Sequence, residues 1–496
     1  MFRPAPRRSD VGEIVSSNDR LFGQKNVVGG GADRGKRGRV RSPFLSDMTR
    51  FAYRLYRVLS GLNYRLSRRF TSAGVIVLVS LFFSAAIGVD MDQSVAFEVF
   101  VLALSLLAVS IGCAYFFRGQ FAVQRELPRY ATVSEPVVYP VRIQNRTAKT
   151  FHGLDLLEDL ADPRPTLAEF ASLQRSAARG QSFRLARSQS SPLNLRQAAV
   201  KTTPLHELPA RGQAEAQVEL TPLRRGPLRF TGAIVARRDP FGLFRGFARV
   251  PRPQTLLVLP RRYSAPALAL PGQRKYQQGG VALASIIGES DEFVSLRDYR
   301  PGDPMRQIHW RSWARTGRPI VREFQDEFFV RHALVLDAFA APEQAAAFEE
   351  AVSVAASFAY MIDTQESLLD LMFVGPQAVR FTVGRGLSHM EHALEILAAV
   401  QPCREKPFRA LQDLVLQHAR EICGCICVLL DGDTARRELV RQLRALDLPV
   451  LVLVVAEPDL AERLRANGDE AAPERFHVLQ VGNVPEGLQE VGRSLL

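Results

Sequence analysis

The sequence predicts a chain with two N-terminal transmembrane helices, an all-β sandwich-like domain and an α/β doubly wound C-terminal domain. Three observations support this fold class. Two uncharged apolar runs lie near the N-terminus, and short apolar segments broken by Pro, Gly and Asn follow them. After residue 330, apolar segments alternate with longer helical ones. These patterns are typical of membrane spans, antiparallel β-structure and βα units, respectively.

The two apolar runs cover residues 71–89 and 99–117, and neither contains a charged side chain. As a helix, each is long enough to cross a bilayer core of about 30 Å at about 1.5 Å per residue. Arginines precede the first run and follow the second, while residues 90–98 between them are acidic. The positive-inside rule therefore predicts a transmembrane hairpin at 71–117 in the cytoplasmic (inner) membrane, with both termini in the cytoplasm. A pair of buried core helices is the alternative.

The positive charge is concentrated at the N-terminus. The chain has a formal net charge of +13, and residues 1–70 contain 16 Lys/Arg against five Asp/Glu. The excess therefore belongs to a flank of the membrane segment, and we expect no nucleic-acid partner. We interpret residues 1–47 as a disordered basic N-terminus and residues 48–70 as a basic juxtamembrane helix on the anionic inner leaflet. Met1 and Met48 are both candidates for the true start.

Residues 118–262 form the predicted β domain. Short apolar runs at 136–143, 216–220 and 254–260 are separated by turn residues, which favours a small antiparallel sandwich. A Ser-, Arg- and Gln-rich tract at 163–212 indicates a long surface insertion. The segment Arg238-Asp239-Pro240-Phe241-Gly242-Leu243-Phe244 predicts a tight corner in which Asp239 caps the turn and the two phenylalanines anchor it.

Residues 331–496 form the predicted α/β domain. Strand-like runs at 332–337, 422–431 and 449–455 alternate with helical segments, which favours a parallel sheet. Such sheets bind ligands at the carboxyl ends of their strands, where Asp337 and Asp431 lie. Cysteines at 423, 425 and 427 would share one face of a strand, and we interpret them as part of a buried strand because zinc-like spacing is absent.

Between the two domains, residues 263–330 contain the segment with the strongest functional signal. Seven arginines, six carboxylates, both tryptophans and His309 fall within residues 288–323. This composition suits a partly buried network of ion pairs and stacked rings. The candidate binding residues are Glu289, Arg297, Asp298, Tyr299, Gly302, Asp303, His309, Trp310 and Arg311. Arginines at 311, 315, 318 and 322 would form one basic stripe if the segment were a continuous helix, or would pair internally with neighbouring carboxylates.

This segment resembles the signature of the family named domain of unknown function 58 (DUF58). The matching residues are Gly288-Glu289, the run from Arg297 to Asp303, and Ile308-His309-Trp310 followed by a basic stretch. Arg224-Arg225-Gly226 and the corner at 238–244 resemble a second family block upstream. The resemblance implies a bacterial membrane protein with a β-sandwich-like domain, and a MoxR-type AAA+ ATPase as its partner.

The C-terminal domain resembles a von Willebrand factor A-like, Rossmann-type domain. In that family a divalent metal binds to an Asp-x-Ser-x-Ser motif, a Thr and a second Asp. Asp337 and Asp431 match the two aspartates, but Phe339 and Ala341 replace the serines, and Ser388 is a weak match for the Thr. Two carboxylates and waters would hold Mg²⁺ weakly. We therefore expect a degenerate, unoccupied site and no cofactor, with Mg²⁺ binding as the alternative.

Together these features predict a membrane-anchored cytoplasmic scaffold or adaptor that binds proteins and works with the ATPase in protein assembly or maturation. We expect no enzymatic activity, because motifs for phosphate loops and nucleophile elbows are absent. The alternative is a hydrolase of phosphorylated or nucleotide substrates that uses the 288–323 segment. In that case His309 would act as a general base beside Asp298 or Asp303.

Overall fold

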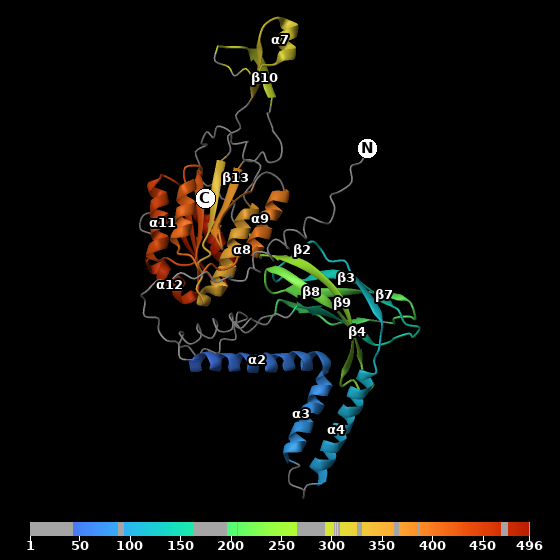
Figure 1. Cartoon of the computed structure of the whole chain (residues 1–496). Helices are drawn as coiled ribbons and strands as arrows, with labels where there is room; N and C mark the ends of the chain where they lie inside the picture. The colour runs from blue at the N-terminus through green and yellow to red at the C-terminus, as the bar shows by residue number, and fades with distance from the viewer. Residues whose placement is uncertain are drawn as a thin grey trace, which may run out of the picture. The chain divides into compact units, whose positions relative to one another are not determined.

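The computed structural model describes residues 43–87, 94–161, 196–205, 207–264, 293–301, 303, 305, 308–324, 330–361, 367–383, 387–467 and 475–495 (Figure 1). The chain divides into two compact units, residues 1–54 and 55–496, and every contact reported below lies within the second unit. The predicted disordered N-terminus up to residue 42, together with Glu289 and Gly302, lies outside the described residues.

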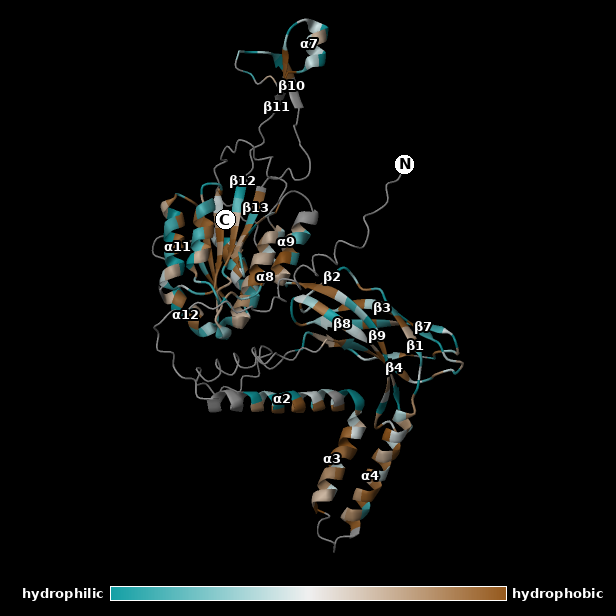
Figure 2. Cartoon of the chain, viewed as in Figure 1, coloured by the Kyte–Doolittle hydropathy of each residue, from teal (hydrophilic) through white to brown (hydrophobic). Residues whose placement is uncertain are grey.

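Three helices open the described chain: α2 (Pro43–Arg69), α3 (Ser72–Ile87) and α4 (Ser94–Tyr115). Within the described residues, one helix is long and apolar enough to cross a membrane, and it covers Val95–Tyr115. Helix α3 is equally apolar but has 16 residues, which gives a length of about 24 Å at 1.5 Å per residue. In Figure 2 both helices are mostly hydrophobic, although α4 contains Glu98 near its start. The length of α4 therefore supports the second predicted transmembrane span, whereas α3 is shorter than the bilayer core that the first predicted span would cross.

Two sheets form the β domain. One has the strand order β1-β3-β7-β5 and the other the order β2-β9-β8-β4-β6. Their strands are β1 (Phe121–Arg125), β2 (Tyr130–Thr132), β3 (Val137–Asn145), β4 (Leu154–Leu160), β5 (Ala198–Val200), β6 (Thr203–Leu205), β7 (Gln213–Pro222), β8 (Gly226–Arg238) and β9 (Arg245–Leu259). Inward-facing residues of both sheets, such as Val141, Val218, Leu156 and Phe230, share one buried core. This is the arrangement that alternating apolar and polar positions dictate for two packed sheets.

The predicted surface insertion at 163–212 is shorter than expected on its C-terminal side. Strands β5 and β6 lie within it and pair with β7 and β4, respectively. The tract from 162 to 195 lies outside the described residues. Short strands beside a polar tract have little periodicity of their own, so the sequence pattern did not separate them from the insertion.

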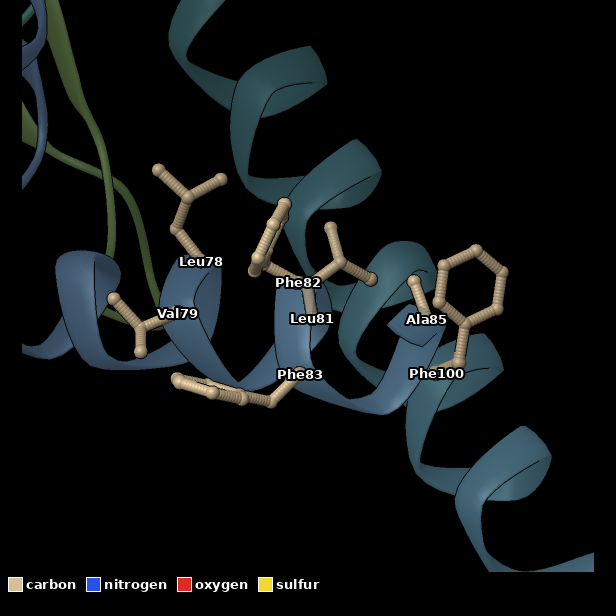
Figure 3. A pocket seen from close by; sticks show the side chains of 7 residues that line it. All are labelled: Leu78, Val79, Leu81, Phe82, Phe83, Ala85 and Phe100. Carbon is tan, nitrogen blue, oxygen red and sulfur yellow. The ribbon is translucent and has the colours of Figure 1, made fainter. Parts of the chain in front are cut away.

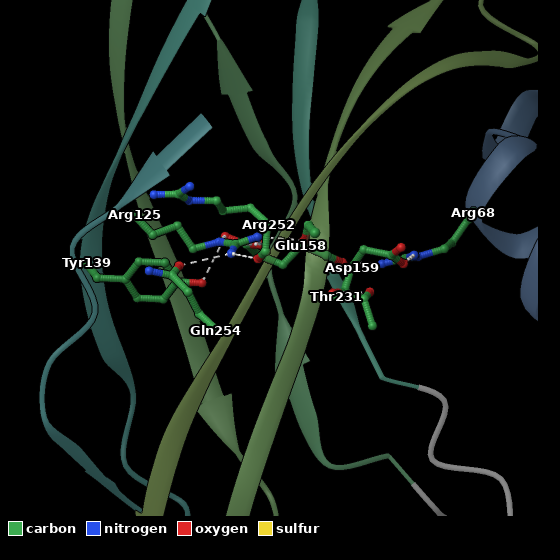
Figure 4. Close-up of polar contacts among 9 residues, drawn as sticks. Arg68, Arg125, Tyr139, Glu158, Asp159, Thr231, Arg252 and Gln254 are labelled. Atoms are coloured by element: carbon green, nitrogen blue, oxygen red, sulfur yellow. Dashed lines mark hydrogen bonds and ion pairs between the residues drawn. The ribbon is translucent and has the colours of Figure 1, made fainter. Parts of the chain in front are cut away.

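A buried ion pair connects the two sheets of the sandwich. The guanidinium of Arg125 in β1 donates to both oxygens of Glu158 in β4 at 2.7–2.9 Å, and both side chains are fully buried (Figure 4). Tyr139 donates to Glu158 at 3.1 Å, and Arg125 also donates to the carbonyl of Gly232 at 2.6 Å. Burying a charge is tolerated because its hydrogen bonds are satisfied in this way.

The C-terminal domain contains a sheet with the strand order β14-β13-β12-β15-β16-β17. All neighbouring pairs are parallel except β13 and β14. The strands are β12 (Val330–Leu336), β13 (Ser367–Val374), β14 (Ala378–Val383), β15 (Gly424–Leu429), β16 (Val450–Ala456) and β17 (Phe476–Gln480). Since β13 and β15 flank β12 on opposite sides, the strand order reverses between β12 and β15. A parallel sheet has its ligand-binding crevice at such a point, beyond the carboxyl ends of the strands.

Helices cover this sheet on both sides in Figure 1, with α8 and α9 on one side and α11 and α12 on the other. The helices are α8 (Ala345–Met361), α9 (Leu387–Ala399), α10 (Arg409–His418), α11 (Thr434–Ala445), α12 (Pro458–Asn467) and α13 (Val484–Leu495). The buried strands β15 and β16 are apolar throughout because they are covered on both faces. Cys425 and Cys427 of β15 and Cys423 just before it are buried, as expected of a buried strand.

Arg225, in the Arg-Arg-Gly block before β8, joins the sandwich to the α/β domain. Its side chain is 6% exposed and donates to the carbonyls of Leu397 (3.2 Å) and Val400 (2.5 Å) at the end of α9. It also forms an ion pair with Glu349 of α8. Cations are stabilised at helix carboxyl ends, where carbonyls lack intrahelical partners. The first of the two upstream motifs is therefore an interdomain contact.

Candidate functional site

The 288–323 segment folds around two antiparallel strands, β10 (Phe293–Asp298) and β11 (Ile320–Phe324), with the short helix α7 (Trp310–Thr316) between them. We call β10, α7, β11 and their connections the signature module. Ile308 and Val321 are buried and form a β-bridge, so they make up a minimal core. A two-stranded hairpin of this size is marginally stable by itself, which makes its internal polar contacts important.

Arg297 and Asp303 form the clamp of the module. The guanidinium donates to the two carboxylate oxygens at 2.7 and 2.8 Å, and the amide of Arg300 donates to the same carboxylate at 2.8 Å. These hydrogen bonds, first from Arg297 and then from Arg300, lower the pKa of Asp303 to about 2. The side chains of Arg297 and Asp303 are 33% and 15% exposed. The pair closes the turn after β10, and its half-buried side chains agree with the partly buried ion pairs that the composition suggested.

His309 lies apart from this clamp. Its Nδ1 is 2.6 Å from the hydroxyl of Ser312, and its backbone N–H donates to the carbonyl of Ile320 at 2.8 Å. The hydrolase alternative would place Asp298 or Asp303 beside the imidazole, and the side-chain partner of His309 in the described part of the chain is Ser312. The reason is local, because His309 immediately precedes α7 and the first turn of a helix brings residues three apart together. Asp298 is exposed at the end of β10, and the backbone N–H of Tyr299 bonds to Pro319.

The two tryptophans form an aromatic pair on α7, in which Trp310 is exposed and Trp313 is half-buried. Trp310 and Trp313 stack with their ring centroids 5.3 Å apart and their planes 20° from parallel. Trp310 is 63% exposed, and α7 has no buried residue. Arg311 and Arg315 are exposed on the same helix, and Met305 before it is 75% exposed. The module therefore presents aromatic, sulfur and guanidinium groups outward.

The predicted basic stripe over residues 311–322 does not form on one helix. Helix α7 ends at Thr316, since Gly317 adopts the left-handed conformation with φ of 70° and donates to the carbonyl of Trp313 at 2.9 Å. Glycine favours this C-terminal cap because it lacks a Cβ. Arg318 consequently follows the helix, and the backbone of residue 322 belongs to β11.

Asp337 is the central residue of the second candidate site, at the carboxyl end of β12. It is fully buried. One oxygen accepts the backbone N–H of Phe339 at 2.9 Å, and the other accepts the backbone N–H of Leu430 at 3.1 Å and the side-chain Nε–H of Arg436 at 2.6 Å. Complete burial raises the pKa of Asp337, although Arg436 and the two amides favour its charged form. The short contact to a guanidinium identifies an ion pair.

Arg436 lies where a cation bound to Asp337 would lie. Its side chain is 8% exposed, packs its guanidinium 4.9 Å from the ring centre of Phe408, and bonds to Asp433 at 2.8 Å. Burial lowers the pKa of Arg436, but Asp337 outweighs this effect and raises it. Asp431, the second predicted metal ligand, accepts the backbone N–H of Gly432 at 2.7 Å. Within the described residues, no group of three His, Cys, Asp or Glu side chains is placed to hold a metal ion.

A further charged cluster lies on β13 and β14. Asp370 is fully buried and accepts from Arg380 (2.8 Å) and Thr382 (2.7 Å), while Arg331 of β12 approaches to 3.9 Å. Arg380 also pairs with Glu421. Partial burial raises the pKa of Glu421, but Arg380 and then His418 more than compensate, so the pKa is lowered. This network connects β12, β13 and β14 to the end of α10, which indicates a structural role.

A cavity of about 640 Å³ lies along α3 and α4. The close-up in Figure 3 shows its lining of aliphatic and aromatic side chains. The lining residues are Leu78, Val79, Leu81, Phe82, Phe83, Ala85 and Phe100. Phe82 and Phe83 are 73% and 60% exposed. Because the lining contains no titratable group, the cavity offers no catalytic chemistry.

Sequence reasoning missed Arg436, Asp370 and the Arg125–Glu158 pair. A signal existed for Arg436, since it precedes the buried Val440 by four residues and the buried Leu443 by seven, which places it on the apolar face of α11. Asp370 interrupts an apolar strand run, which is a comparable signal. A charge at an apolar position predicts a buried partner, but the partner itself is remote in sequence.

Comparison with known families supports the family resemblance. The profile described as "Protein of unknown function DUF58" matches residues 295–467, from the signature module through α12. The chain is 29% identical over 184 residues to the uncharacterized protein YeaD of Bacillus subtilis. That match covers 36% of this chain and 44% of the relative, so the chain spans less than half of the relative's length.

Three solved structures are similar to parts of the chain at low identity. The CARDB domain of the PF1109 protein of Pyrococcus furiosus is 11% identical, and the match covers 28% of this chain and 93% of that one with a TM-score of 0.16. The major subunit AggA of aggregative adherence fimbriae of Escherichia coli is 10% identical, and the match covers 29% of this chain and 96% of that one with a TM-score of 0.15. A cohesin module of a Clostridium perfringens family 33 glycoside hydrolase is 8% identical, and the match covers 28% of this chain and 98% of that one with a TM-score of 0.13. TM-scores this low support no conclusion about the function of this chain.

Proposed function

We propose that this protein is a membrane-anchored cytoplasmic adaptor that binds other proteins through its signature module. The observation that carries the proposal is the exposure of the module, in which Trp310 and Met305 are 63% and 75% exposed. Tryptophan and arginine are enriched among the residues that dominate protein–protein binding energy. A two-stranded hairpin whose described residues include only Ile308 and Val321 as a core gains stability from a partner that covers its apolar side chains.

The proposed anchor is the inner membrane, with α3 and α4 as a two-span hairpin. The many exposed apolar residues of both helices support this, as does the stripe of exposed apolar residues Leu55, Val58, Leu59 and Leu62 on α2. Their spacing of three and four residues aligns them on one helix face, and arginines accompany them. In this topology both termini lie in the cytoplasm.

The proposed partner is a MoxR-type AAA+ ATPase, and the proposed process is assembly or maturation of other proteins. The family resemblance supports this assignment. We further propose that the C-terminal domain is a von Willebrand factor A-like domain that acts without a metal. The ion pair between Asp337 and Arg436 supports a metal-free site, because both carboxylate oxygens already have donors.

The test is binding of the full chain, reconstituted in nanodiscs, to the MoxR-type ATPase encoded in the same genome. We expect Trp310→Ala to weaken binding by roughly 30-fold, as loss of a hot-spot residue of about 2 kcal/mol would. Leu446→Ala is the matched control, since Leu446 is 51% exposed at the end of α11. Lack of binding by the wild type would reject the ATPase as partner. Equal losses for both variants would reject the signature module as the binding surface.

A hydrolase remains the second candidate function, favoured by the 2.6 Å contact between His309 and Ser312. An imidazole within hydrogen-bond reach of a hydroxyl is the arrangement that activates a serine nucleophile. Phosphatase or nuclease turnover by the full chain that is abolished by both His309→Ala and Ser312→Ala would establish this function in place of the adaptor.

A further inference from the structure

The turn between β8 and β9 is the second upstream motif, and Asp239 organises it. The carboxylate accepts the backbone N–H groups of Phe241 (3.0 Å) and Phe244 (2.6 Å), as the predicted cap requires. Phe244 is 6% exposed and anchors the turn. The prediction was wrong for Phe241, which is 52% exposed at the tip. A rigid, capped turn thus presents a large aromatic side chain to its surroundings.

The start of α3 holds this turn. The hydroxyl of Thr71 donates to the carbonyl of Gly242 at 2.5 Å, and its backbone N–H donates to that of Leu243 at 3.1 Å. A Cβ on Gly74 would lie 2.1 Å from the Leu243 carbonyl oxygen, so the backbones of the helix and the turn are in direct contact. Phe70 packs edge-on against Phe244 at 5.0 Å. The tip of the turn is therefore fixed beside the first turn of the apolar helix.

The end of α4 holds the adjacent part of β9. A Cβ on Gly246 would lie 2.8 Å from the carbonyl oxygen of Ala114, which places the strand directly against the helix. Tyr115 and Phe116, at and just beyond the last turn of α4, are 76% and 79% exposed. Three exposed aromatic side chains thus lie at the two helix ends that contact the sandwich, Phe241 beside the start of α3 and the other two at the end of α4.

We propose that the β8–β9 turn inserts Phe241 into the headgroup region of a phospholipid bilayer and, with Tyr115 and Phe116, seats the sandwich on the membrane surface. This inference rests on the membrane anchor of the proposed function. Aromatic rings concentrate at the boundary between headgroups and acyl chains. The exposed guanidinium of Arg69 lies 5.4 Å from the ring centre of Phe247 on the same side of the sandwich, where it complements anionic headgroups.

The test uses the full chain in proteoliposomes of phosphatidylethanolamine and phosphatidylglycerol, with and without brominated acyl chains. Phe241→Trp supplies a new fluorophore, and the signal of the parent chain is subtracted to remove Trp310 and Trp313. Leu223→Trp is the matched control, because Leu223 is 40% exposed and lies just before the opposite end of β8. That strand of 13 residues separates the two positions by about 40 Å at 3.3 Å per residue.

We expect brominated lipid to quench the added signal of Phe241→Trp roughly twofold or more, as for an interfacial tryptophan, and to leave Leu223→Trp unchanged. Pro240→Trp, at the neighbouring exposed position, is the second reporter if Phe241→Trp does not fold. If the chain stays in the membrane after an alkaline carbonate wash but both reporters are unquenched, the insertion of the turn is refuted and the membrane anchor stands. A chain released by that wash would overturn the membrane anchor and the inference with it.

Discussion

Replacing Arg436 by methionine tests the claim that its guanidinium serves as the cation of the Asp337 site. The substitution keeps most of the side-chain volume over Phe408 but leaves the fully buried carboxylate of Asp337 with two backbone donors. Breaking a buried ion pair in this way costs about 3–5 kcal/mol, because the remaining charge is uncompensated. We expect the α/β domain to lose that much stability.

Hydrogen exchange with mass spectrometry is the suitable assay, since it reports the α/β domain separately from the rest of a multidomain chain. A loss of 3–5 kcal/mol corresponds to roughly 10²- to 10⁴-fold faster exchange of the Phe339 and Leu430 amides, at about 1.4 kcal/mol per tenfold. Arg437→Met is the matched control, because Arg437 is the exposed neighbour on α11. Similar exchange in Arg436→Met, Arg437→Met and the wild type would refute the reasoning.

Arg436→Met also tests whether the guanidinium occupies the position that a metal cation would take beside Asp337. In Arg436→Met the carboxylate of Asp337 lacks its positive partner, so added Mg²⁺ or Mn²⁺ should slow exchange again. A ligand present at 100 times its dissociation constant stabilises the folded state by about 2.7 kcal/mol. The wild type, in which Arg436 occupies the position, should not respond to either ion. A response of the wild type that is lost in Asp337→Asn would show that a metal displaces the arginine.

Three other perturbations have defined outcomes. Because the pKa of Asp303 is about 2 instead of 3.8, its charged form stabilises the signature module above about pH 4, and this stabilisation is lost as the pH falls toward 2. Tryptophan fluorescence should report the loss of structure, and Asp303→Asn should abolish the pH dependence of the fluorescence. His332 is 9% exposed and burial lowers its pKa, so the folded state favours the neutral imidazole. The stability of the α/β domain is therefore full above pH 6.5 and falls on acidification below that value. Hydrogen exchange of the β12 amides should accelerate on acidification in the wild type but not in His332→Gln. Tyr139→Phe removes one hydrogen bond to Glu158 and should cost about 1 kcal/mol, whereas Arg125→Met should cost about 3–5 kcal/mol in denaturant unfolding of the sandwich. Equal costs for the last two variants would contradict the assignment of an ion pair.

The two upstream motifs illustrate how short sequence blocks acquire a role through packing. The sequence predicts a turn at 238–244, and that turn has the predicted aspartate cap. The contacts of each block involve segments more than a hundred residues away, as between Arg225 and Leu397 or Thr71 and Gly242. Turn chemistry is local and therefore readable in a sequence, whereas the surface against which a turn packs is not.

The sequence by itself determined the order of the parts: uncharged apolar helices, then alternating short strands, then strands interleaved with helices. These features follow from the spacing of apolar residues, which depends on near neighbours in the chain. The tertiary structure decided which charged side chains meet. Asp337 and Arg436 are 99 residues apart and Arg125 and Glu158 are 33 apart, yet each pair is in direct contact. An ion pair depends on a distance of a few ångströms between atoms, and only the folded chain fixes that distance.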